Sequence, residues 1–178
     1  MDFERLLQLH VICFKKLIKG KIYKSEGVVQ QQKKCLHQNT LELTQSISEL
    51  FNAEIMGHRF RKIWEEYLEN VCVYIDAVYT ADDVCKDFGD DKAYRDSFLA
   101  VSKLRKNSGE MVGFFTRYLN NRHTFKPIWI FYMQALKDSI DDGLKLFHKR
   151  GSSVQLRKSI TECKHRAKEF GRLINSFW

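Results

Sequence analysis

The sequence predicts an all-α protein, an antiparallel up-and-down bundle of five to six helices in which residues 1–178 form a single domain. The chain holds one proline and nine glycines in 178 residues, and sheet proteins of this size need many more turn-forming residues. Apolar residues recur at intervals of three and four along most of the chain, which is the spacing of one helix face. Hydrophobic residues make up 44% and charged residues 29%, a balance typical of a chain that forms its own core.

The first two predicted helices lie on either side of Gly20. Apolar side chains recur with helical spacing over Phe3–Ile18, and Gly20 is the expected stop because glycine commonly ends a helix. The second helix is expected over about Ser25–Phe51. Its stretch Gln30–Lys34 is polar on every side, so only its second half has a clear apolar face.

A central helix is predicted over His58–Tyr79, whose apolar stripe is the clearest in the chain. Trp64 lies midway along this stripe, with Phe60 four residues before it and Tyr67 three residues after it. This spacing places the indole in the interior of the bundle. We expect it to contact one of two apolar faces further along the chain, either Ile128, Phe131 and Leu136 or Ile160 and Phe170.

A loop, with room for one short turn of helix, is predicted over Thr80–Asp91, which is rich in aspartate and contains Gly89. Such composition is typical of turns. A helix over Lys92–Leu119 follows. Within it, the triplet Asn107–Gly109 either starts a new helix or lies in one bent helix, and the sequence leaves these alternatives open.

The fifth predicted helix runs to about Lys149. Pro127 stands three residues after Thr124, so we expect it in the first turn, where its missing N–H breaks no hydrogen bond. The stretch Ile128–Met133 is apolar on every side, which predicts that it is packed between several neighbours. Gly151–Ser153 should then end this helix and cap the last one.

The cysteines are five in number and widely spaced: Cys13, Cys35, Cys72, Cys85 and Cys163. A zinc site or a disulfide framework needs clustered or paired cysteines, so we interpret them as small buried hydrophobic residues. We therefore expect an intracellular location, cytoplasmic or nuclear, in a reducing compartment. The longest apolar run has six residues, far fewer than the roughly 18–20 that span a bilayer, so no membrane span is expected.

Positive charge is concentrated at the two ends of the chain. Residues 1–34 hold eight Lys and Arg against three acids, and residues 149–178 hold eight against two, so the ends carry net charges of +5 and +6 and the middle carries −3. The first and last helices of an antiparallel bundle can be neighbours, which would merge these cations into one face. The candidate interaction face consists of Lys15, Lys16, Lys19, Lys21, Lys24, Lys149, Arg150, Arg157, Lys158, Lys164, Arg166, Lys168 and Arg172.

Three interpretations of this charge remain open. A contiguous basic face attracts phosphate backbones or an acidic partner. The lysines are alternatively an ordinary solvated helix surface. Binding of the amphipathic first helix to a lipid surface is the third interpretation, because such a helix and a packed core helix have the same sequence pattern.

Two pairs of residues have the spacing of a catalytic Arg–His pair in helical ribonuclease-like domains of the HEPN type. They are Arg117 with His123 and Arg5 with His10. The many arginines and histidines of the chain produce about one such match by chance. No Gly-rich phosphate loop, nucleophile elbow or His-Glu-x-x-His is present in the sequence, so we predict no catalytic residue.

Metal ligands are not indicated either. Glu162 and His165 form one Glu-x-x-His spacing, whereas a di-iron bundle needs two such spacings and further glutamates. His10 and His58 lie near apolar faces, and a hydrogen-bonded core histidine is the ordinary case there. We predict no cofactor.

The stretch Leu36–Asn39, followed by Gly57, Ile63–Asn70 and Asp76–Val78, resembles a family of uncharacterised small helical-bundle proteins. Those proteins carry a Leu-x-x-Asn helix, a glycine, and a long amphipathic helix that ends in a small-residue step. The resemblance covers about a quarter of the chain. Because the family has no assigned activity, the resemblance implies a helical bundle and no function.

These observations favour a noncatalytic structural or interaction protein, a compact helical module that docks into a larger assembly such as a virion or another multi-subunit complex. The alternatives are nonspecific nucleic-acid binding by the basic first and last helices, and a metal- or cofactor-binding bundle. The first hypothesis predicts an exposed apolar patch, the second a contiguous basic face, and the third at least three converging His or carboxylate side chains. The sequence leaves open the protein partner and the oligomeric state.

Overall fold

The computed structural model describes residues 2–84, 91–119, 122–147 and 151–177, and these contain six α-helices and no strand. The helices are α1 (Phe3–Ile22), α2 (Glu26–Phe51), α3 (Glu54–Val84), α4 (Asp91–Leu119), α5 (Arg122–Phe147) and α6 (Ser153–Asn175). None of the described helices is long and apolar enough to cross a bilayer.

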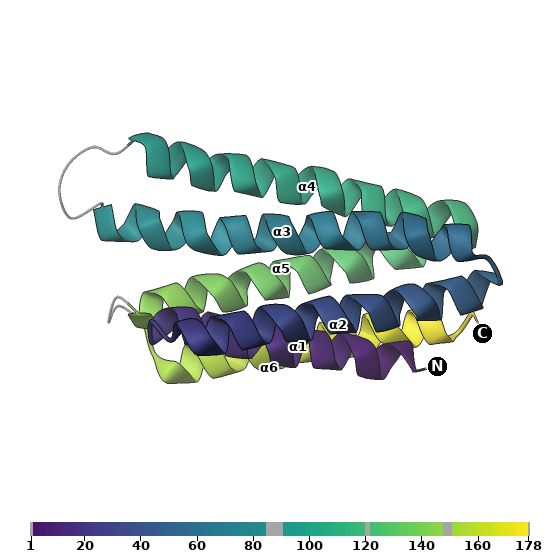
Figure 1. Cartoon of the computed structure of the whole chain (residues 1–178), viewed down its shortest axis with the longest axis horizontal. Coiled ribbons are helices and arrows are strands. Elements are labelled where there is room, and N and C mark those ends of the chain that lie inside the picture. Colours follow the sequence, from purple (N-terminus) through teal and green to yellow (C-terminus); the bar gives the residue numbers. More distant parts are fainter. Residues whose placement is uncertain (1, 85–90, 120–121, 148–150, 178) are drawn as a thin grey trace.

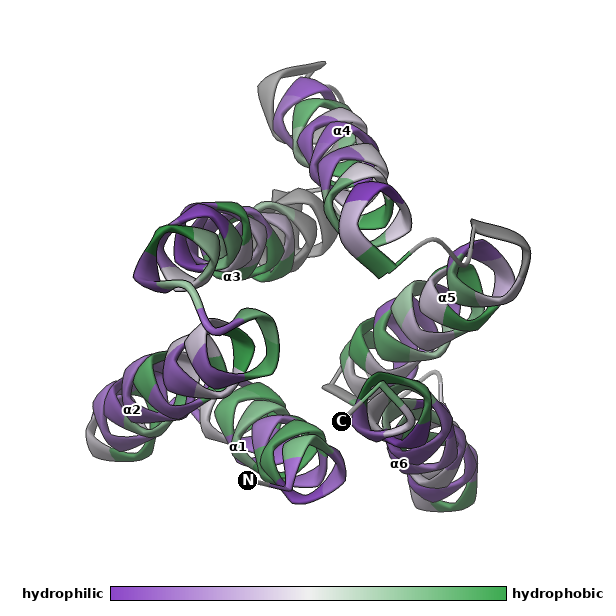
Figure 2. Cartoon of the chain, turned by 90° about the vertical axis from the view of Figure 1, so that its right-hand side faces the viewer, coloured by the Kyte–Doolittle hydropathy of each residue, from purple (hydrophilic) through white to green (hydrophobic). Residues whose placement is uncertain are grey.

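The helices form a closed ring in chain order. Each helix packs against the next, and α6 returns to pack against α1, as the view along the bundle shows (Figure 2). Successive helices run in opposite directions, and the two termini lie at the same end of the bundle (Figure 1). The predicted all-α antiparallel bundle is therefore confirmed.

Trp64 is fully buried at the centre of this ring, as predicted. Its ring centroid lies 5.1 Å from that of His10 on α1, 5.3 Å from that of Phe60 and 6.2 Å from that of Trp129 on α5. The prediction that Phe131 would be part of the buried contact face was wrong, because the side chain of Phe131 is 53% exposed. Trp129 occupies the interior position on α5 instead.

The first connection differs from the predicted stop at Gly20. Helix α1 continues to Ile22, and Gly20 instead allows close packing, since a Cβ on it would lie 3.1 Å from side-chain atoms of Val28 and Val29 on α2. Ser25 precedes α2, close to the predicted start, and its backbone N–H donates to the carbonyl oxygen of Gly20 at 2.8 Å.

Helix α3 is longer than predicted and overruns part of the loop expected over Thr80–Asp91. It begins at Glu54, and residues 80–84 are its last helical residues. The aspartates of this stretch therefore belong partly to the end of a helix, which composition alone does not distinguish from a loop.

Helix α4 is unbroken at Asn107–Gly109, which resolves the alternatives that the sequence left open. The Asn107 side-chain amide donates to the carbonyl oxygen of Ile63 on α3 at 2.9 Å, and the Ser108 hydroxyl accepts from Trp129 Nε1 at 2.8 Å. Both polar side chains therefore make tertiary contacts, and the interpretation of this triplet as the start of a new helix is excluded.

Pro127 lies inside α5 rather than in its first turn. The helix begins at Arg122, so the proline is its sixth residue and removes an N–H that the helix would otherwise use. The last helix begins as predicted, because the Ser152 hydroxyl accepts a hydrogen bond from the backbone N–H of Gln155 at 3.1 Å.

Cys13 and Cys35 form a disulfide that joins α1 and α2. This corrects the interpretation of all five cysteines as unpaired hydrophobic residues. The pairing has no local sequence signature, because antiparallel helices bring distant residues together. Cys72 and Cys163 are free thiols, and burial raises the pKa of Cys163 to about 12. Cys85 lies outside the described residues.

Candidate functional site

Helices α4 and α5 enclose an open apolar groove. They are held together by the Trp129–Ser108 hydrogen bond and by the stacked rings of Phe115 and Phe125, whose centroids are 4.5 Å apart. Beyond these contacts a groove of about 350 Å³ opens between them, and α3 forms its floor. Its apolar lining consists of Val71, Tyr74, Val101, Leu104, Ile130, Met133, Leu136 and Ile140.

Large hydrophobic side chains are exposed at the edges of this groove. Ile130 is a lining residue and is 46% exposed. Phe98 is 73% exposed, and it stands three residues before Val101, on the same side of α4. Next to it on α4, Leu99 is 55% exposed and shares a second hollow with Val73 of α3.

The expectation that Ile128–Met133 would be packed on every side was therefore wrong. Trp129 and Tyr132 are buried, whereas Ile130 and Phe131 are exposed. An all-apolar run on a helix must place some of its residues on each side, and the bundle covers only one side of α5 here. This uninterrupted apolar run was itself the sequence signal for an exposed apolar surface.

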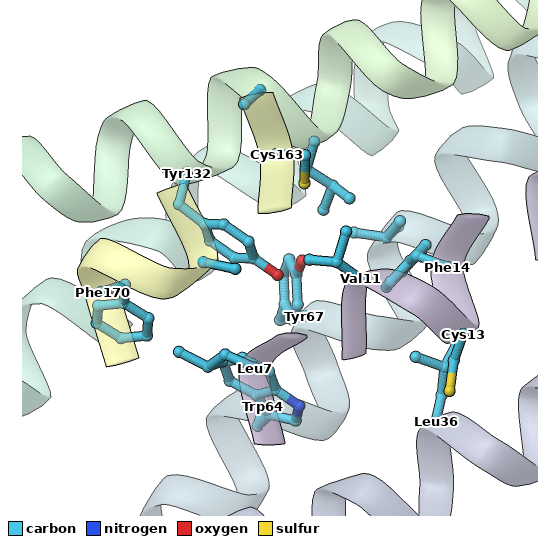
Figure 3. Close-up of a cluster of buried hydrophobic side chains, with 14 of the residues drawn as sticks. Leu7, Val11, Cys13, Phe14, Leu36, Trp64, Tyr67, Tyr132, Cys163 and Phe170 are labelled. Carbon is cyan, nitrogen blue, oxygen red and sulfur yellow. The ribbon is translucent and has the colours of Figure 1, made fainter. Parts of the chain in front are cut away.

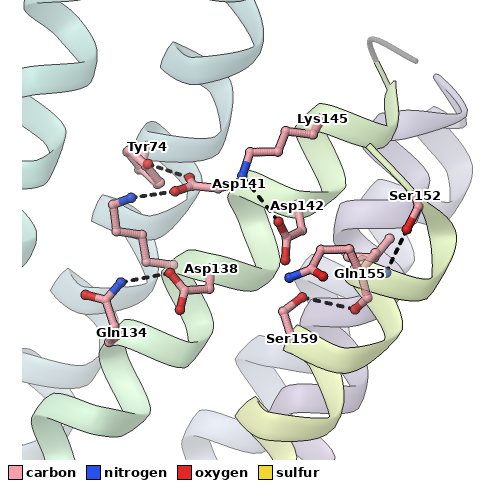
Figure 4. A network of polar contacts seen from close by, with 11 residues as sticks. Tyr74, Gln134, Asp138, Asp141, Asp142, Lys145, Ser152, Gln155 and Ser159 are labelled. Atoms are coloured by element: carbon pink, nitrogen blue, oxygen red, sulfur yellow. Dashed lines mark hydrogen bonds and ion pairs between the residues drawn. The ribbon is translucent and has the colours of Figure 1, made fainter. Parts of the chain in front are cut away.

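The polar residues of the groove largely satisfy one another. The Tyr74 hydroxyl donates to Asp141 Oδ1 at 2.8 Å, and Lys137 Nζ donates to Asp141 Oδ2 at 2.5 Å (Figure 4). Burial and the Asp141 carboxylate raise the pKa of Tyr74. Arg105 also lines the groove and forms no ion pair with a described residue.

Part of the candidate basic face converges where α1 meets α6. Burial is the largest cause that lowers the pKa of Lys15 on α1, and the nearby positive charges of Lys19, Lys164 and Arg157 lower it further. Lys164 and Arg157 belong to α6, so cations of the two helices lie close together. Sequence reasoning placed these four residues on one face, and the structure brings them together.

The other residues of the candidate face have different surroundings. Lys168 and Arg172 pair with Glu4, and Arg166 pairs with Glu162 and Glu169. Lys21 pairs with Asp76 of α3. The remaining exposed residues are Lys16, Lys24 and Lys158, while Lys149 and Arg150 lie outside the described residues.

The described residues include both members of the candidate pairs Arg5–His10 and Glu162–His165. Arg5 is exposed whereas His10 is fully buried, and the His123 side chain lies outside the described residues. His165 is exposed and lies 3.4 Å from Glu169. The described residues contain no group of three or more His, Cys, Asp or Glu side chains placed to hold a metal ion.

The centre of the bundle contains several buried polar groups. Neither ring nitrogen of His10 has a hydrogen-bond partner within the described residues, and burial lowers the pKa of His10 to about 3, opposed in part by the nearby Asn39 side chain. The hydroxyl ends of Tyr67 and Tyr132 point toward each other beside Cys163 (Figure 3). These groups are enclosed by the core and face none of the grooves described above.

Comparison of the chain with protein-family models, with curated proteins and with solved structures gives no match. The functional argument therefore rests on the residues and geometry described above.

Proposed function

We propose that the chain is a noncatalytic interaction module that receives an amphipathic helix of a partner protein in the groove between α4 and α5. The observation that supports this function is the exposed apolar groove itself. Its lining is mostly aliphatic, and Ile130 at its edge is 46% exposed. Contiguous exposed apolar surface is typical of sites that another molecule covers.

The shape of the groove favours a helix as its occupant. The groove runs between two antiparallel helices over a floor formed by a third. The residues on α4 that line it extend from Val101 to Ser108, which is about two helical turns or roughly 10 Å. An additional helix laid between α4 and α5 would bury the lining residues and Phe98 as one more member of the ring.

The charge at the groove indicates what kind of helix fits. Asp141 already binds Tyr74 and Lys137, and Asp138 accepts a hydrogen bond from Gln134 at 2.8 Å. Arg105 has no such counter-charge among the described residues. The partner helix therefore carries an apolar face flanked by an acidic side chain that reaches Arg105, since opposite charges across an interface set orientation.

The proposal is tested by affinity capture from the native source with matched variants, followed by titration of a synthetic peptide that corresponds to the captured partner's amphipathic helix. Phe98→Ser and Ile130→Ser should each weaken peptide binding by about tenfold or more, because truncating a large apolar side chain that the partner covers is expected to cost over about 1.4 kcal/mol. Val154→Ser is the control, because Val154 is 57% exposed on α6, away from the groove.

Equal capture by all three variants would contradict the proposal. Multi-angle light scattering tests a second occupant. If the parent is a dimer and both groove variants are monomers, the groove binds a second copy of the chain, and that result would also overturn the proposal.

A further inference from the structure

The boundary between α1 and α6 is closely packed, and it holds their side chains in a fixed arrangement. Gly171 of α6 lies against Glu4 of α1 so closely that a Cβ on it would be 2.3 Å from the Glu4 Cα atom. The backbone N–H of Phe3 donates to the Asn175 side chain at 3.1 Å. The two helices run in opposite directions (Figure 1), and Glu4 at the start of α1 pairs with Arg172 near the end of α6, so Lys15 and Lys19 lie beside the first half of α6.

Four cations gather at that part of the boundary, and we call Lys15, Lys19, Arg157 and Lys164 the basic seam. Burial and, after it, repulsion by the other three cations lower the pKa of Lys15. None of the four forms an ion pair with a described residue. A protein surface that holds like charges together without counter-ions is suited to an anionic ligand.

No carboxylate is available from either helix to neutralise the basic seam. Residues 5–22 contain no Asp or Glu, and neither do residues 153–161. Glu4 is already held by Lys168 and Arg172, and Arg166 holds the two glutamates of α6. The positive charge therefore extends along the seam without interruption.

The arrangement favours an extended polyanion over a single phosphate or a lipid surface. Arg157 and Lys164 are about 10 Å apart along α6, and Lys15 and Lys19 about 6 Å apart along α1. Such a row matches repeated charges, as along a nucleic-acid strand. Interfacial helices insert an exposed apolar face into lipid, whereas the apolar face of α1, including Phe14 and Leu17, is buried in the core.

We propose that the basic seam binds the phosphate backbone of nucleic acid without reading its bases. This binding is independent of the α4–α5 groove, which lies elsewhere on the ring. Its energy comes from release of counter-ions, so it must weaken steeply with added salt.

Fluorescence anisotropy with a labelled duplex DNA of random sequence tests the proposal over a range of KCl concentrations. With all four cations in contact, a plot of log K against log salt should have a slope of about −3 to −4. The double variant Lys15→Gln, Lys164→Gln should make the slope shallower by about 2 units and weaken binding at low salt by about tenfold or more.

The matched control is Lys62→Gln, Lys103→Gln, which removes the same net charge from the exposed faces of α3 and α4. It should leave the slope unchanged, and a circular-dichroism melt should show that both double variants remain folded. Phe98→Ser should bind DNA like the parent, which separates this proposal from that of the groove.

Three results would overturn the proposal. They are absence of binding at low salt, equal losses in the two double variants, and binding to phosphatidylserine vesicles that depends on Lys15 and Lys164 when DNA binding does not. The last result would assign the seam to an anionic membrane surface.

Discussion

The boundaries α1–α6 and α4–α5 each join two antiparallel helices, yet one is closed and the other is partly open. At α1–α6 a glycine, Gly171, lies in contact with the backbone of Glu4. At α4–α5 the helices meet at Ser108 and Trp129 and then leave a groove of about 350 Å³. The comparison shows that the residue at the crossing sets the approach of two helices, since glycine permits contact of backbones and bulky residues hold them apart.

The polar groups near the two boundaries also differ. Around the open groove, Tyr74 bonds Asp141 and Trp129 bonds Ser108. In the closed interior, the ring nitrogens of His10 and the Trp64 Nε1 atom have no partner within the described residues. Buried polar groups without partners lower stability, so packing of the surrounding rings must stabilise the closed interior.

The largest expected effect is that of Trp64→Ala in this interior. The indole is fully buried against His10, Phe60 and Trp129, and removing such a side chain typically costs about 3–5 kcal/mol. Because a domain has only about 5–15 kcal/mol of stability, the variant should be nearly unfolded at ambient temperature. Urea denaturation of parent and variant measures the loss.

Ile130→Ala is the comparison at the open groove. Ile130 is 46% exposed, so its truncation should cost less than about 1 kcal/mol. If the two variants lost equal stability, the distinction between a packed interior and an open groove would be wrong.

The burial of Trp64 was predictable from sequence because the stripe around it has a strict helical period and no competing signal. The bundle class followed from the same period along most of the chain and from the scarcity of turn-forming residues. The residues of the basic seam were predictable, since the first and last helices of an antiparallel bundle can be neighbours, and all four belonged to the candidate interaction face.

The all-apolar run that contains Ile130 was a signal for some exposed apolar surface, but the groove itself was not predictable, because it depends on how far α4 lies from α5. The run does not indicate which of its residues the neighbouring helix leaves exposed. The roles of Gly20 and Gly171 likewise depend on backbone contacts with another helix. The disulfide of Cys13 and Cys35 depends on the axial register of α1 against α2, and no local spacing of residues determines that register.

Gly171→Ala tests the closed boundary directly. Its Cβ would meet the backbone of Glu4 at 2.3 Å from Cα, so the helices must separate, and such overpacking costs about 1–3 kcal/mol. The matched control is Gly113→Ala on α4, where a Cβ would meet nothing within 4 Å. That variant should gain about 0.5–1 kcal/mol from the better helix propensity of alanine.

Thermal melts of the two glycine variants should therefore shift in opposite directions. Similar stabilisation of both would show that α1 and α6 are not in backbone contact, and the closed boundary would then resemble the open one.

The last expected effect is a pH dependence that arises from His10, which is fully buried in the interior of the bundle. Burial lowers the pKa of His10 from 6.5 to about 3, so the folded protein keeps the ring neutral. The unfolded chain binds a proton below about pH 6.5, and therefore binds more protons than the folded chain between the two values. Stability from this group is complete above pH 6.5 and falls by about 1.4 kcal/mol per pH unit as the pH decreases toward 3.

Urea denaturation at pH 7 and pH 5 should show a loss of about 2 kcal/mol that His10→Leu abolishes, because leucine keeps the site apolar without a titrating group. The exposed His58→Gln variant should keep the pH dependence of the parent. NMR of the folded protein provides a readout that does not require a variant, since the His10 ring resonances should not titrate between pH 8 and 5. If the His10 ring became protonated in the folded state near pH 6, water would reach the interior beside α1. The boundary between α1 and α6 would then be as open as the groove between α4 and α5.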